Sequence, residues 1–407
     1  MANRTITGAK GFRAAAVACG IKTSGKPDVA LLVSDVPATA AAVFTTNKVV
    51  GAPIIVGRKH IQSGVLRACV INAGCANVCT GDRGVRNAME MCALAAAGIG
   101  ADPDEVLPSS TGVIGHFLPM EKVRMGISHA TMALSNSAEA GTAFANGILT
   151  TDLVAKTAFA TVKVGGKTVT IAGCCKGSGM IAPNMALPQA TMLAYVATDA
   201  AIDKRALRKV IAEVTGQTFN CVTVDQHTST SDTFVVLANG MAENKKIVGG
   251  SDLKKFAAAL YEVCDSLSQQ IARDGEGATK LITVTVTGAA TAADAKKAAE
   301  AIANSPLCKT AVHGGDPNWG RFVSAAGYSG AKMNPDKGLC KVGDVLVFKN
   351  GQPTKVELAA VGEVMQGKEV SILVDLGVMA GKAGYSHRVY TCDLSREYIA
   401  INADYHT

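Results

Sequence analysis

The feature that most restricts the fold of this 407-residue chain is a set of short, almost uninterrupted apolar runs. Residues 28–35 read DVALLVSD, residues 65–72 read VLRACVIN, and an apolar run follows residue 191. Such runs are typical of strands that are buried on both faces. A sheet of this kind needs further layers on each side, so the sequence predicts an α/β sandwich of sheet and helix layers.

Helices and hairpins are expected between and after these strands. Residues 84–100 have helical spacing and end on glycine, as a C-cap would. Two alternating runs meet at Gly165-Gly166 and two more at Asn350-Gly351, which indicates hairpins over 158–173 and 345–358. No Pro- or Ser-rich linker divides the chain, so its halves are expected to be woven together. Further helices are expected at 203–216, 254–275 and 292–305, and further strands at 220–225, 280–288, 369–376 and 386–392.

Composition excludes several classes of protein. Hydrophobic residues make up 48% of the chain and charged residues 18%, which favours a large core over disorder. The net charge of +7 comes from scattered Lys and Arg residues, so a nucleic-acid partner is not expected. The sequence contains no run of about 18 apolar residues and opens without the apolar region of a secretory signal, so neither a membrane span nor export is expected.

The cysteines and histidines do not form a metal-binding pattern. The spacings Cys75-x3-Cys79 and Cys174-Cys175 lack the paired CxxC form, and no histidine is close to them. The twelve cysteines are therefore expected to be buried free thiols in a reducing cytoplasm. His227 and His313 stand near glycine and polar residues, and we interpret both as structural.

Two glycine motifs imitate nucleotide-binding loops. Residues 20–27, GIKTSGKP, have the Gly-x4-Gly-Lys spacing, but Pro27 replaces the magnesium-binding hydroxyl and a strand follows. Residues 177–182, GSGMIA, are followed by Pro183-Asn184, which prevents the helix that a dinucleotide fold requires. Neither motif supports a nucleotide site.

Thr191 stands where an irregular loop becomes a buried strand, in KGSGMIAPNMALPQATMLAYVATDA (176–200). A Thr hydroxyl at such a junction can attack the carbonyl of the preceding Ala190 and form an ester that water resolves. The new α-amine, with a pKa near about 8, can then act as a base toward the adjacent hydroxyl. The simpler alternative is that Thr191 is a β-branched residue that opens a strand.

A second element is the small-residue stretch PSSTGVIG (108–115), which we interpret as a turn. Such a turn can present backbone N–H groups and a Thr hydroxyl to a developing oxyanion. The alternative is an ordinary glycine turn between a strand and a helix.

Together these stretches resemble the glutamate N-acetyltransferase (ornithine acetyltransferase) family of arginine biosynthesis. The resemblance runs from about residue 10 to residue 407. Its motifs are GFRAAAVACGIK, PATAAAVFTTNKV, SSTGVIG, LTTD, KGSGMIAPNMA with ATML, DGEGATK, NWGR and INADYHT.

The resemblance implies a self-cleaving threonine acyltransferase with a layered α/β fold similar to the N-terminal-nucleophile-like aminopeptidases. Cleavage would give pieces 1–190 and 191–407 that remain together and pair as α2β2. The implied reaction moves acetyl from N2-acetylornithine to glutamate in the cytoplasm without a cofactor or metal. Some members of the family also use acetyl-CoA as donor.

The resemblance also implies roles for single residues. Thr191 would cleave the chain after Ala190 and then carry the acetyl group, and Thr111 with the N–H of Gly112 would form the oxyanion hole. The implied substrate-binding residues are Thr150 or Thr151, Lys176, Thr191, Glu276, Asn402 and Thr407. Lys176 is suited to a substrate carboxylate and Glu276 to the ammonium of ornithine.

The chain departs from the family pattern at a few positions. Four residues, LPQA, stand between PNMA and TML, and Cys75, Gln226 and His227 replace the usual residues. Two other functions remain open at this point. One is an amidase or aminopeptidase of the same fold, and the other is an unprocessed protein that binds acyl amino acids.

Overall fold

The computed structural model describes residues 3–186, 192–379 and 382–404. The chain divides into two compact units, which are described separately. Unit 1 comprises Met1–Asn220 and Thr228–Ile271, and unit 2 comprises Cys221–His227 and Ala272–Thr407. The predicted 190/191 boundary thus falls inside unit 1, between two segments that belong to the same sheet.

Unit 1 is built around one large sheet with the strand order β4-β3-β2-β9-β8-β6-β5, and both β1 and β7 pair with β2. Its strands are β1 (Phe12–Val17), β2 (Val29–Thr45), β3 (Val65–Cys75), β4 (Val106–Val113), β5 (Lys156–Val164), β6 (Lys167–Lys176), β7 (Met185–Ala186), β8 (Leu193–Thr198) and β9 (Thr233–Ala238). Its helices are α1 (Ala52–His60), α2 (Gly81–Ile99), α3 (Met120–Met132), α4 (Ala138–Gly147), α5 (Lys204–Gln217) and α6 (Gly250–Arg273), the last of which ends in unit 2.

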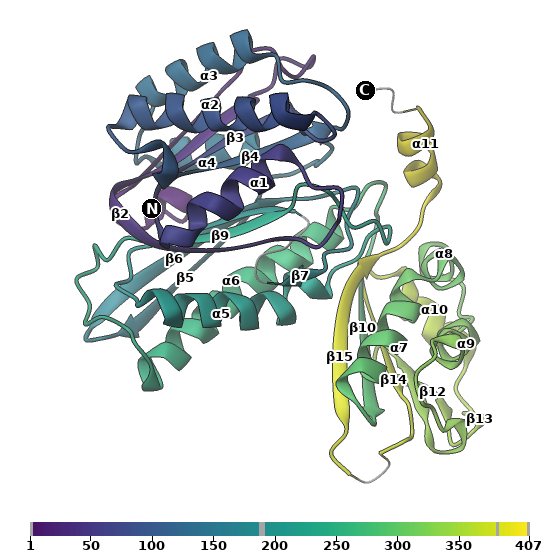
Figure 1. The fold of residues 1–407 in the computed structure, drawn as a ribbon. Helices are drawn as coiled ribbons and strands as arrows, with labels where there is room; N and C mark the ends of the chain where they lie inside the picture. The colour runs from purple at the N-terminus through teal and green to yellow at the C-terminus, as the bar shows by residue number, and fades with distance from the viewer. Residues whose placement is uncertain (1–2, 187–191, 380–381, 405–407) are drawn as a thin grey trace. The chain divides into compact units, whose positions relative to one another are not determined.

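The long strand β2 connects two parts of this sheet. Its pairing with β3 shifts register between Val33 and Ala38, and beyond that point β2 pairs with β9. One apolar core contains Leu32 and Ile71 from the first part together with Leu193 and Tyr195 from the second. Figure 1 shows α2 and α3 on one side of unit 1 and α5 and α6 on the other. The predicted layered α/β sandwich is confirmed for this unit.

Several local predictions are confirmed by the backbone. Helix α2 ends at Gly100, which adopts φ +66° as a left-handed C-cap. The β5–β6 hairpin turns at Gly165 and Gly166, with φ +56° and +81°, which is the two-residue turn expected there. Asn350 and Gly351 make the corresponding turn in unit 2, with φ +52° and +78°.

Two local predictions are wrong. Residues 108–113 of the PSSTGVIG stretch are not a turn but the end of strand β4, because each of them pairs in parallel register with β3. Residues 220–225 are not a strand. Val222 makes only an isolated bridge to Tyr390, and the buried Lys309 Nζ donates to the Val224 carbonyl at 2.7 Å, so this segment is fixed by single contacts.

Unit 2 contains a second sheet with the order β13-β12-β11-β14-β10-β15, and its helices α7 and α9 contact one another and the sheet. Apolar residues of the sheet and these helices form one core, which includes Val284, Ile302, Phe322 and Ile372. The strands are β10 (Leu281–Ala289), β11 (Leu339–Val342), β12 (Val345–Lys349), β13 (Gln352–Pro353), β14 (Glu369–Asp375) and β15 (Tyr385–Cys392). The helices are α7 (Ala292–Asn304), α8 (Pro306–Gly314), α9 (Gly320–Tyr328), α10 (Leu358–Gln366) and α11 (Arg396–Asp404).

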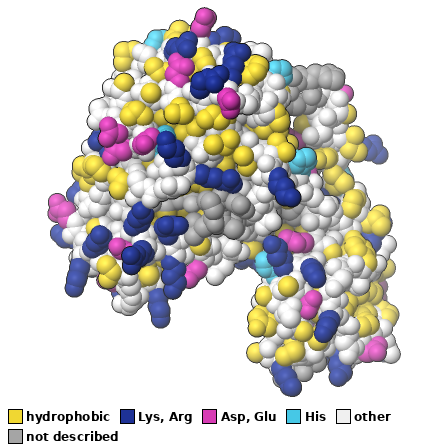
Figure 2. Space-filling model, viewed as in Figure 1, with side chains coloured by type: hydrophobic (Ala, Val, Ile, Leu, Met, Phe, Trp, Pro, Cys, Tyr) yellow, Lys and Arg dark blue, Asp and Glu magenta, His cyan; other side chains and the backbone are white. Residues whose placement is uncertain are grey.

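The distribution of surface charge and the state of the cysteines agree with what the composition predicts. On the face drawn in Figure 2, the Lys and Arg side chains of unit 1 are interspersed with acidic and apolar ones. All twelve cysteines are free thiols and all except Cys79 are buried, as expected. Among the described helices, none combines the length and the apolar character needed to cross a membrane.

Candidate functional site

Lys176, the last residue of β6, is the centre of a polar cluster in unit 1. Its side chain is 10% exposed. The Nζ atom donates to Thr150 Oγ1 at 2.8 Å and to Thr111 Oγ1 at 3.3 Å. The fold therefore brings together three of the predicted site residues from distant parts of the chain. Of the two candidate threonines in LTTD, it is Thr150 that contacts Lys176.

The fully buried carboxylate of Asp152 contacts several members of this cluster. Its carboxylate accepts Lys156 Nζ at 2.7 Å, the Gly177 N–H at 2.6 Å and the Thr150 N–H at 3.1 Å, and lies 3.9 Å from Lys176 Nζ. Burial alone would raise the pKa of Asp152, but the charges of Lys176 and Lys156 and these hydrogen bonds outweigh it and lower the pKa to about 2. The two ammonium groups and one carboxylate leave one net positive charge here.

We expect Asp152→Asn to be strongly destabilising, because it leaves two nearly buried ammonium groups without their carboxylate. Loss of one partner of such a set costs about 3–5 kcal/mol of unfolding free energy. The pKa of Asp152 is depressed in the folded chain, so its contribution is present above its ordinary pKa and is lost as the pH falls toward 2. Denaturant unfolding should show the wild-type advantage over the variant shrinking by about 1 kcal/mol between pH 6 and pH 3.

The control for this prediction is Asp35→Asn, which removes an exposed carboxylate that pairs with Arg13 at 2.7 Å. Exposed pairs contribute about 0–1 kcal/mol, so this variant should unfold almost as the wild type does. Equal stabilities of the two variants would contradict the buried role of Asp152.

Gly112 follows Thr111 at the end of β4 and can only be glycine. Its φ is +126°, and a Cβ atom at this position would lie 2.4 Å from the carbonyl carbon of Gly74, its register partner on β3. Thr111 and Gly112 are thus held by close backbone packing between two strands. This rigidity is what a fixed pair of oxyanion donors needs.

A small cavity of about 30 Å³ adjoins these residues. Thr111 and Lys176 line it, together with Met192, Ser231 and the buried Asp232. Met192 is the first described residue after Thr191. The predicted residues Ala190, Thr191 and Thr407 themselves lie outside the described residues.

Glu276 and Asn402 meet in unit 2. Asn402 Nδ2 donates to Glu276 Oε2 at 2.9 Å and to the Tyr398 carbonyl at 2.9 Å, so α11 fixes the carboxylate. The neighbouring Gly277 has φ +67°, and a Cβ atom there would meet the Tyr398 nitrogen at 2.4 Å. The DGEGATK loop is therefore shaped around α11.

The same loop is fixed on its other side by Asp393. This carboxylate accepts the N–H groups of Thr279 and Lys280, both at 2.8 Å, and it contacts His313 Nδ1 at 2.7 Å. Burial would raise the pKa of Asp393, but these hydrogen bonds outweigh it and lower the pKa. His313, expected from the sequence to be structural, contributes to this anchoring.

Sequence reasoning missed several members of these clusters. Asp152 belongs to the LTTD motif, whose threonines alone were assigned, and Asp232 ends the TSTSD stretch. Lys22, from GIKTSGKP, donates from its Nζ to the Pro27 carbonyl at 2.6 Å. Burial, with the charge of Lys176, lowers the pKa of Lys22 to about 8 against the opposing charge of Asp28. Asp152 in LTTD and Lys22 in GIKTSGKP are charged residues inside recognised motifs, and this position could have marked them as candidates.

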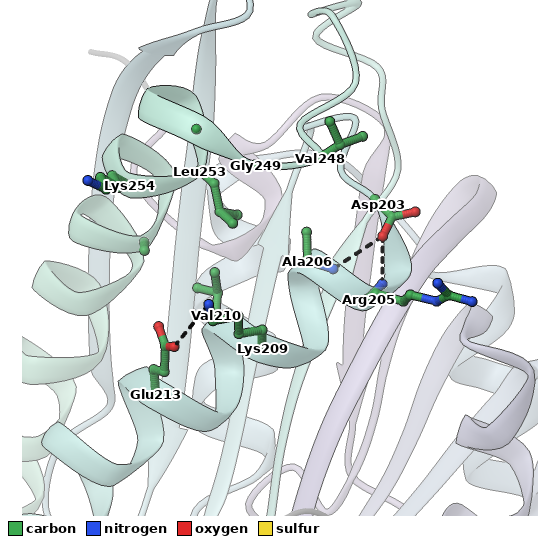
Figure 3. Close-up of a pocket in the computed structure, with 12 residues that line it drawn as sticks. Asp203, Arg205, Ala206, Lys209, Val210, Glu213, Val248, Gly249, Leu253 and Lys254 are labelled. Atoms are coloured by element: carbon green, nitrogen blue, oxygen red, sulfur yellow. Dashed lines mark hydrogen bonds and ion pairs between the residues drawn. The ribbon is translucent and has the colours of Figure 1, made fainter.

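A larger hollow of about 630 Å³ lies between α5 and α6 and contains none of these residues. Figure 3 shows Arg205 and Lys254 on its two sides, pointing in different directions. Asp203 caps α5 by accepting the N–H groups of Arg205 and Ala206. The lining also contains an exposed ion pair between Lys209 Nζ and Glu213 Oε1 at 3.8 Å, which Figure 3 draws as a dashed line.

Comparison with known proteins identifies the family of this chain. Residues 13–407 match the model of the ArgJ family. The chain belongs to the ArgJ family. The arginine biosynthesis bifunctional protein ArgJ of Symbiobacterium thermophilum is 48% identical over 405 residues, which cover 99% of this chain and 98% of the relative. ArgJ of Geobacter sulfurreducens is 48% identical over 400 residues, 98% of this chain and 99% of its own.

Solved structures of ArgJ proteins are also similar to this chain. The crystal structure of the arginine biosynthesis bifunctional protein argJ of Bacillus halodurans is 40% identical, with a TM-score of 0.49. The match covers 52% of this chain and 98% of that chain. Within the described part of the chain, no three His, Cys, Asp or Glu residues are arranged to hold a metal ion.

Proposed function

We propose that this chain transfers acetyl from N2-acetylornithine to glutamate through an acetyl ester on Thr191. Membership of the ArgJ family over residues 13–407 supports the reaction class. The observation that carries the proposal is the contact of Lys176 with Thr111 and Thr150 beside the cavity that Met192 lines. In the proposed arrangement Thr191 is the nucleophile, Lys176 binds the substrate carboxylate, and Thr111 with the Gly112 N–H stabilises the oxyanion of the same acyl group.

The charges of the Lys176 cluster support an amino-acid substrate. Lys176, Lys156 and Asp152 together carry one net positive charge in a largely buried position. A partly exposed ammonium in such a place binds a carboxylate more strongly than it would in water. N2-Acetylornithine and glutamate both carry an α-carboxylate, so one site can hold the donor and then the acceptor.

In the proposed cycle Thr191 Oγ attacks the acetyl carbonyl while its own α-amine accepts the hydroxyl proton. Thr111 Oγ1 and the Gly112 N–H stabilise the negative charge on the carbonyl oxygen. Ornithine leaves with the proton on its α-amine, and an acetyl ester stays on Thr191. The amine of glutamate then attacks this ester by the reverse sequence and leaves as N-acetylglutamate.

The α-amine of Thr191 exists only after the bond to Ala190 is cut. We therefore include self-cleavage into pieces 1–190 and 191–407 in the proposal. Strand β8 pairs with both β6 and β9, so the second piece would begin with a strand that is embedded in the sheet of the first. The pieces would remain together, and pairing of two such assemblies would give α2β2.

Glu276 is proposed to bind the side-chain ammonium of ornithine, and Asn402 and Thr407 to complete that binding. Glu276→Gln keeps the shape and the acceptor for Asn402 but removes the charge. A hydrogen bond between charged groups contributes about 1.5–3 kcal/mol, so the KM for N2-acetylornithine should rise at least about tenfold. The KM for glutamate, which carries no such ammonium, should change much less.

Steady-state kinetics with each substrate varied in turn check this prediction. Glu397→Gln is the control, since it changes an exposed acid on α11. An equal rise of both KM values in Glu276→Gln would argue against recognition of the ornithine ammonium.

The remaining features follow from the proposed reaction. It needs no metal or prosthetic group, and acetyl-CoA could enter only as an alternative acetyl donor. We propose a cytoplasmic location, because the reaction uses free amino acids and the chain has twelve free thiols, which are typical of a reducing compartment.

An assay of the purified protein with both substrates tests the proposal. Formation of ornithine and N-acetylglutamate in equal amounts supports acetyl transfer. Release of acetate that does not depend on glutamate would identify the amidase alternative. Binding of N2-acetylornithine without turnover would identify a binding protein.

A further inference from the structure

Lys22 is a partly exposed lysine that has no role in the acetyl-transfer steps described above. It lies in the loop that follows β1, within the stretch GIKTSGKP. Its Nζ atom donates to the Pro27 carbonyl at 2.6 Å and to the Gly147 carbonyl at 3.5 Å. Both acceptors are neutral, so they do not balance the charge of the ammonium group. An ammonium has three N–H donors, and these two hydrogen bonds leave one of them for a ligand within the part of the chain that the structure describes.

The side chain of Lys22 packs against the ends of β3 and β4. A Cβ atom at Gly74 of β3 would lie 3.3 Å from Lys22 Cγ. Gly74 is the register partner of Gly112 on β4, and a Cβ atom at Gly112 would lie 2.7 Å from the Gly74 Cα. Because both positions are glycine, Lys22 can approach the strand end that carries Thr111.

A second contact of Lys22 leads to the other hydroxyl of the Lys176 cluster. Gly147, whose carbonyl accepts Lys22 Nζ, is the last residue of α4, and Thr150 follows it closely in the chain. Thr150 Oγ1 and Thr111 Oγ1 both accept Lys176 Nζ. The two segments that hold the hydroxyl groups around Lys176 are therefore the segments that Lys22 contacts.

The charges around Lys22 include the ammonium of Lys176. Burial lowers the pKa of Lys22 to about 8; the charges of Lys176 and Lys26 act in the same direction, and those of Asp28 and Asp152 oppose them. The Asp28 carboxylate is already occupied, because it accepts three backbone N–H groups of the loop. A ligand with two carboxylates could meet both ammonium groups and reduce their mutual repulsion.

We propose that Lys22 binds the side-chain carboxylate of the acceptor glutamate while Lys176 binds its α-carboxylate. This inference rests on the proposed function and adds the basis of its preference for glutamate. N2-Acetylornithine and glutamate share the α-carboxylate and differ in their second charged group. The ammonium of Lys22 attracts the second carboxylate of glutamate and repels the side-chain ammonium of the donor. Lys22 thus determines which amino acid accepts the acetyl group.

The test measures the preference for glutamate over glutamine, whose side chain has the same shape and no charge. The ratio of kcat/KM for the two acceptors is determined with N2-acetylornithine as donor. The wild type should prefer glutamate at pH 7. Lys22→Gln should lose at least about tenfold of this preference, while its KM for N2-acetylornithine changes little. Lys22→Arg keeps the positive charge and should retain most of the preference.

Lys26→Gln is the matched control, since it removes an exposed lysine from the same loop. It should keep the wild-type preference. If Lys22 served only to hold the loop through the carbonyls of Pro27 and Gly147, its replacement would affect glutamate, glutamine and the donor alike. Such an equal change would overturn the proposal, and so would a preference for glutamate that survives in Lys22→Gln.

The pH dependence of the wild type tests the same contact without a substitution, so the test does not depend on the folding of a variant. The ratio of kcat/KM values reports groups of the free enzyme, and titration of a shared catalytic group cancels in it. With a pKa of about 8, Lys22 is mostly charged at pH 7 and mostly neutral at pH 9. The preference for glutamate should therefore fall about fivefold between these pH values and stay constant in Lys22→Arg. A wild-type preference that does not change with pH would contradict the proposed contact.

The outcomes separate this inference from the proposed function. If the wild type transfers acetyl to glutamate and Lys22→Gln keeps the preference, only the inference about Lys22 fails. If the wild type transfers acetyl from N2-acetylornithine to neither acceptor, the proposed function fails and the inference fails with it.

Discussion

Thr191→Ala is expected to give one intact chain of 41.6 kDa and no measurable acetyl transfer. The variant lacks the hydroxyl that would cut the Ala190–Thr191 bond and also the hydroxyl that would carry the acetyl group. Loss of a catalytic nucleophile typically lowers kcat by on the order of 10⁵-fold or more. The measurement is intact-mass spectrometry of the purified protein, followed by an assay of ornithine release with both substrates present.

Thr191→Ser is the matched variant, since it keeps a hydroxyl on the same carbon. It should cleave, more slowly than the wild type, and retain part of the transfer activity. The wild type should separate on a denaturing gel into pieces 1–190 and 191–407. Transfer at the wild-type rate by Thr191→Ala would show that Thr191 is not the acetyl carrier.

Gly112→Ala is expected to have the second largest effect. The new Cβ would lie 2.4 Å from the carbonyl carbon of Gly74, and φ of +126° is a conformation that alanine rarely adopts. The end of β4 must therefore move, and it would take the Gly112 N–H and Thr111 away from the oxyanion position. Loss of one oxyanion donor lowers kcat by about 10²–10³-fold.

Gly115→Ala is the control for backbone strain. Gly115 has φ +88°, but an added Cβ would meet no atom within 4 Å. This variant should lose some stability and keep most of its activity, and thermal melting with kcat measurement distinguishes the two effects. If Gly112→Ala and Gly115→Ala lose kcat equally, Gly112 has no special part in stabilising the oxyanion.

Much of the fold could be predicted because local chemistry and tertiary structure agree in most segments. Apolar runs become buried strands such as β2 and β3, and paired glycines become the β5–β6 turn. The turn predicted at 108–115 was wrong because small residues are typical of turns, whereas the structure of residues 108–113 follows from pairing with β3. The strand predicted at 220–225 was wrong because a local sequence pattern does not show whether a partner strand is available for pairing.

The candidate site could be predicted only where a motif pointed to a role. Lys176, Thr111 and Thr150 were expected from motifs, and the fold brings them within hydrogen-bond distance. The Asp152–Lys156 pair could not be found in this way, since it depends on the complete burial of both side chains. Asp232 likewise looks like an ordinary loop acid until its place in the lining of the cavity is known.

The measurement that tests the central claim most directly is the mass of the 191–407 piece after mixing with N2-acetylornithine in the absence of glutamate. The account predicts that this piece gains one acetyl group on Thr191 as one ornithine is released, and that added glutamate removes the group as N-acetylglutamate. If ornithine is released at the full rate from a piece that never carries acetyl, or if the acetyl group is found on a residue other than Thr191, the account is contradicted.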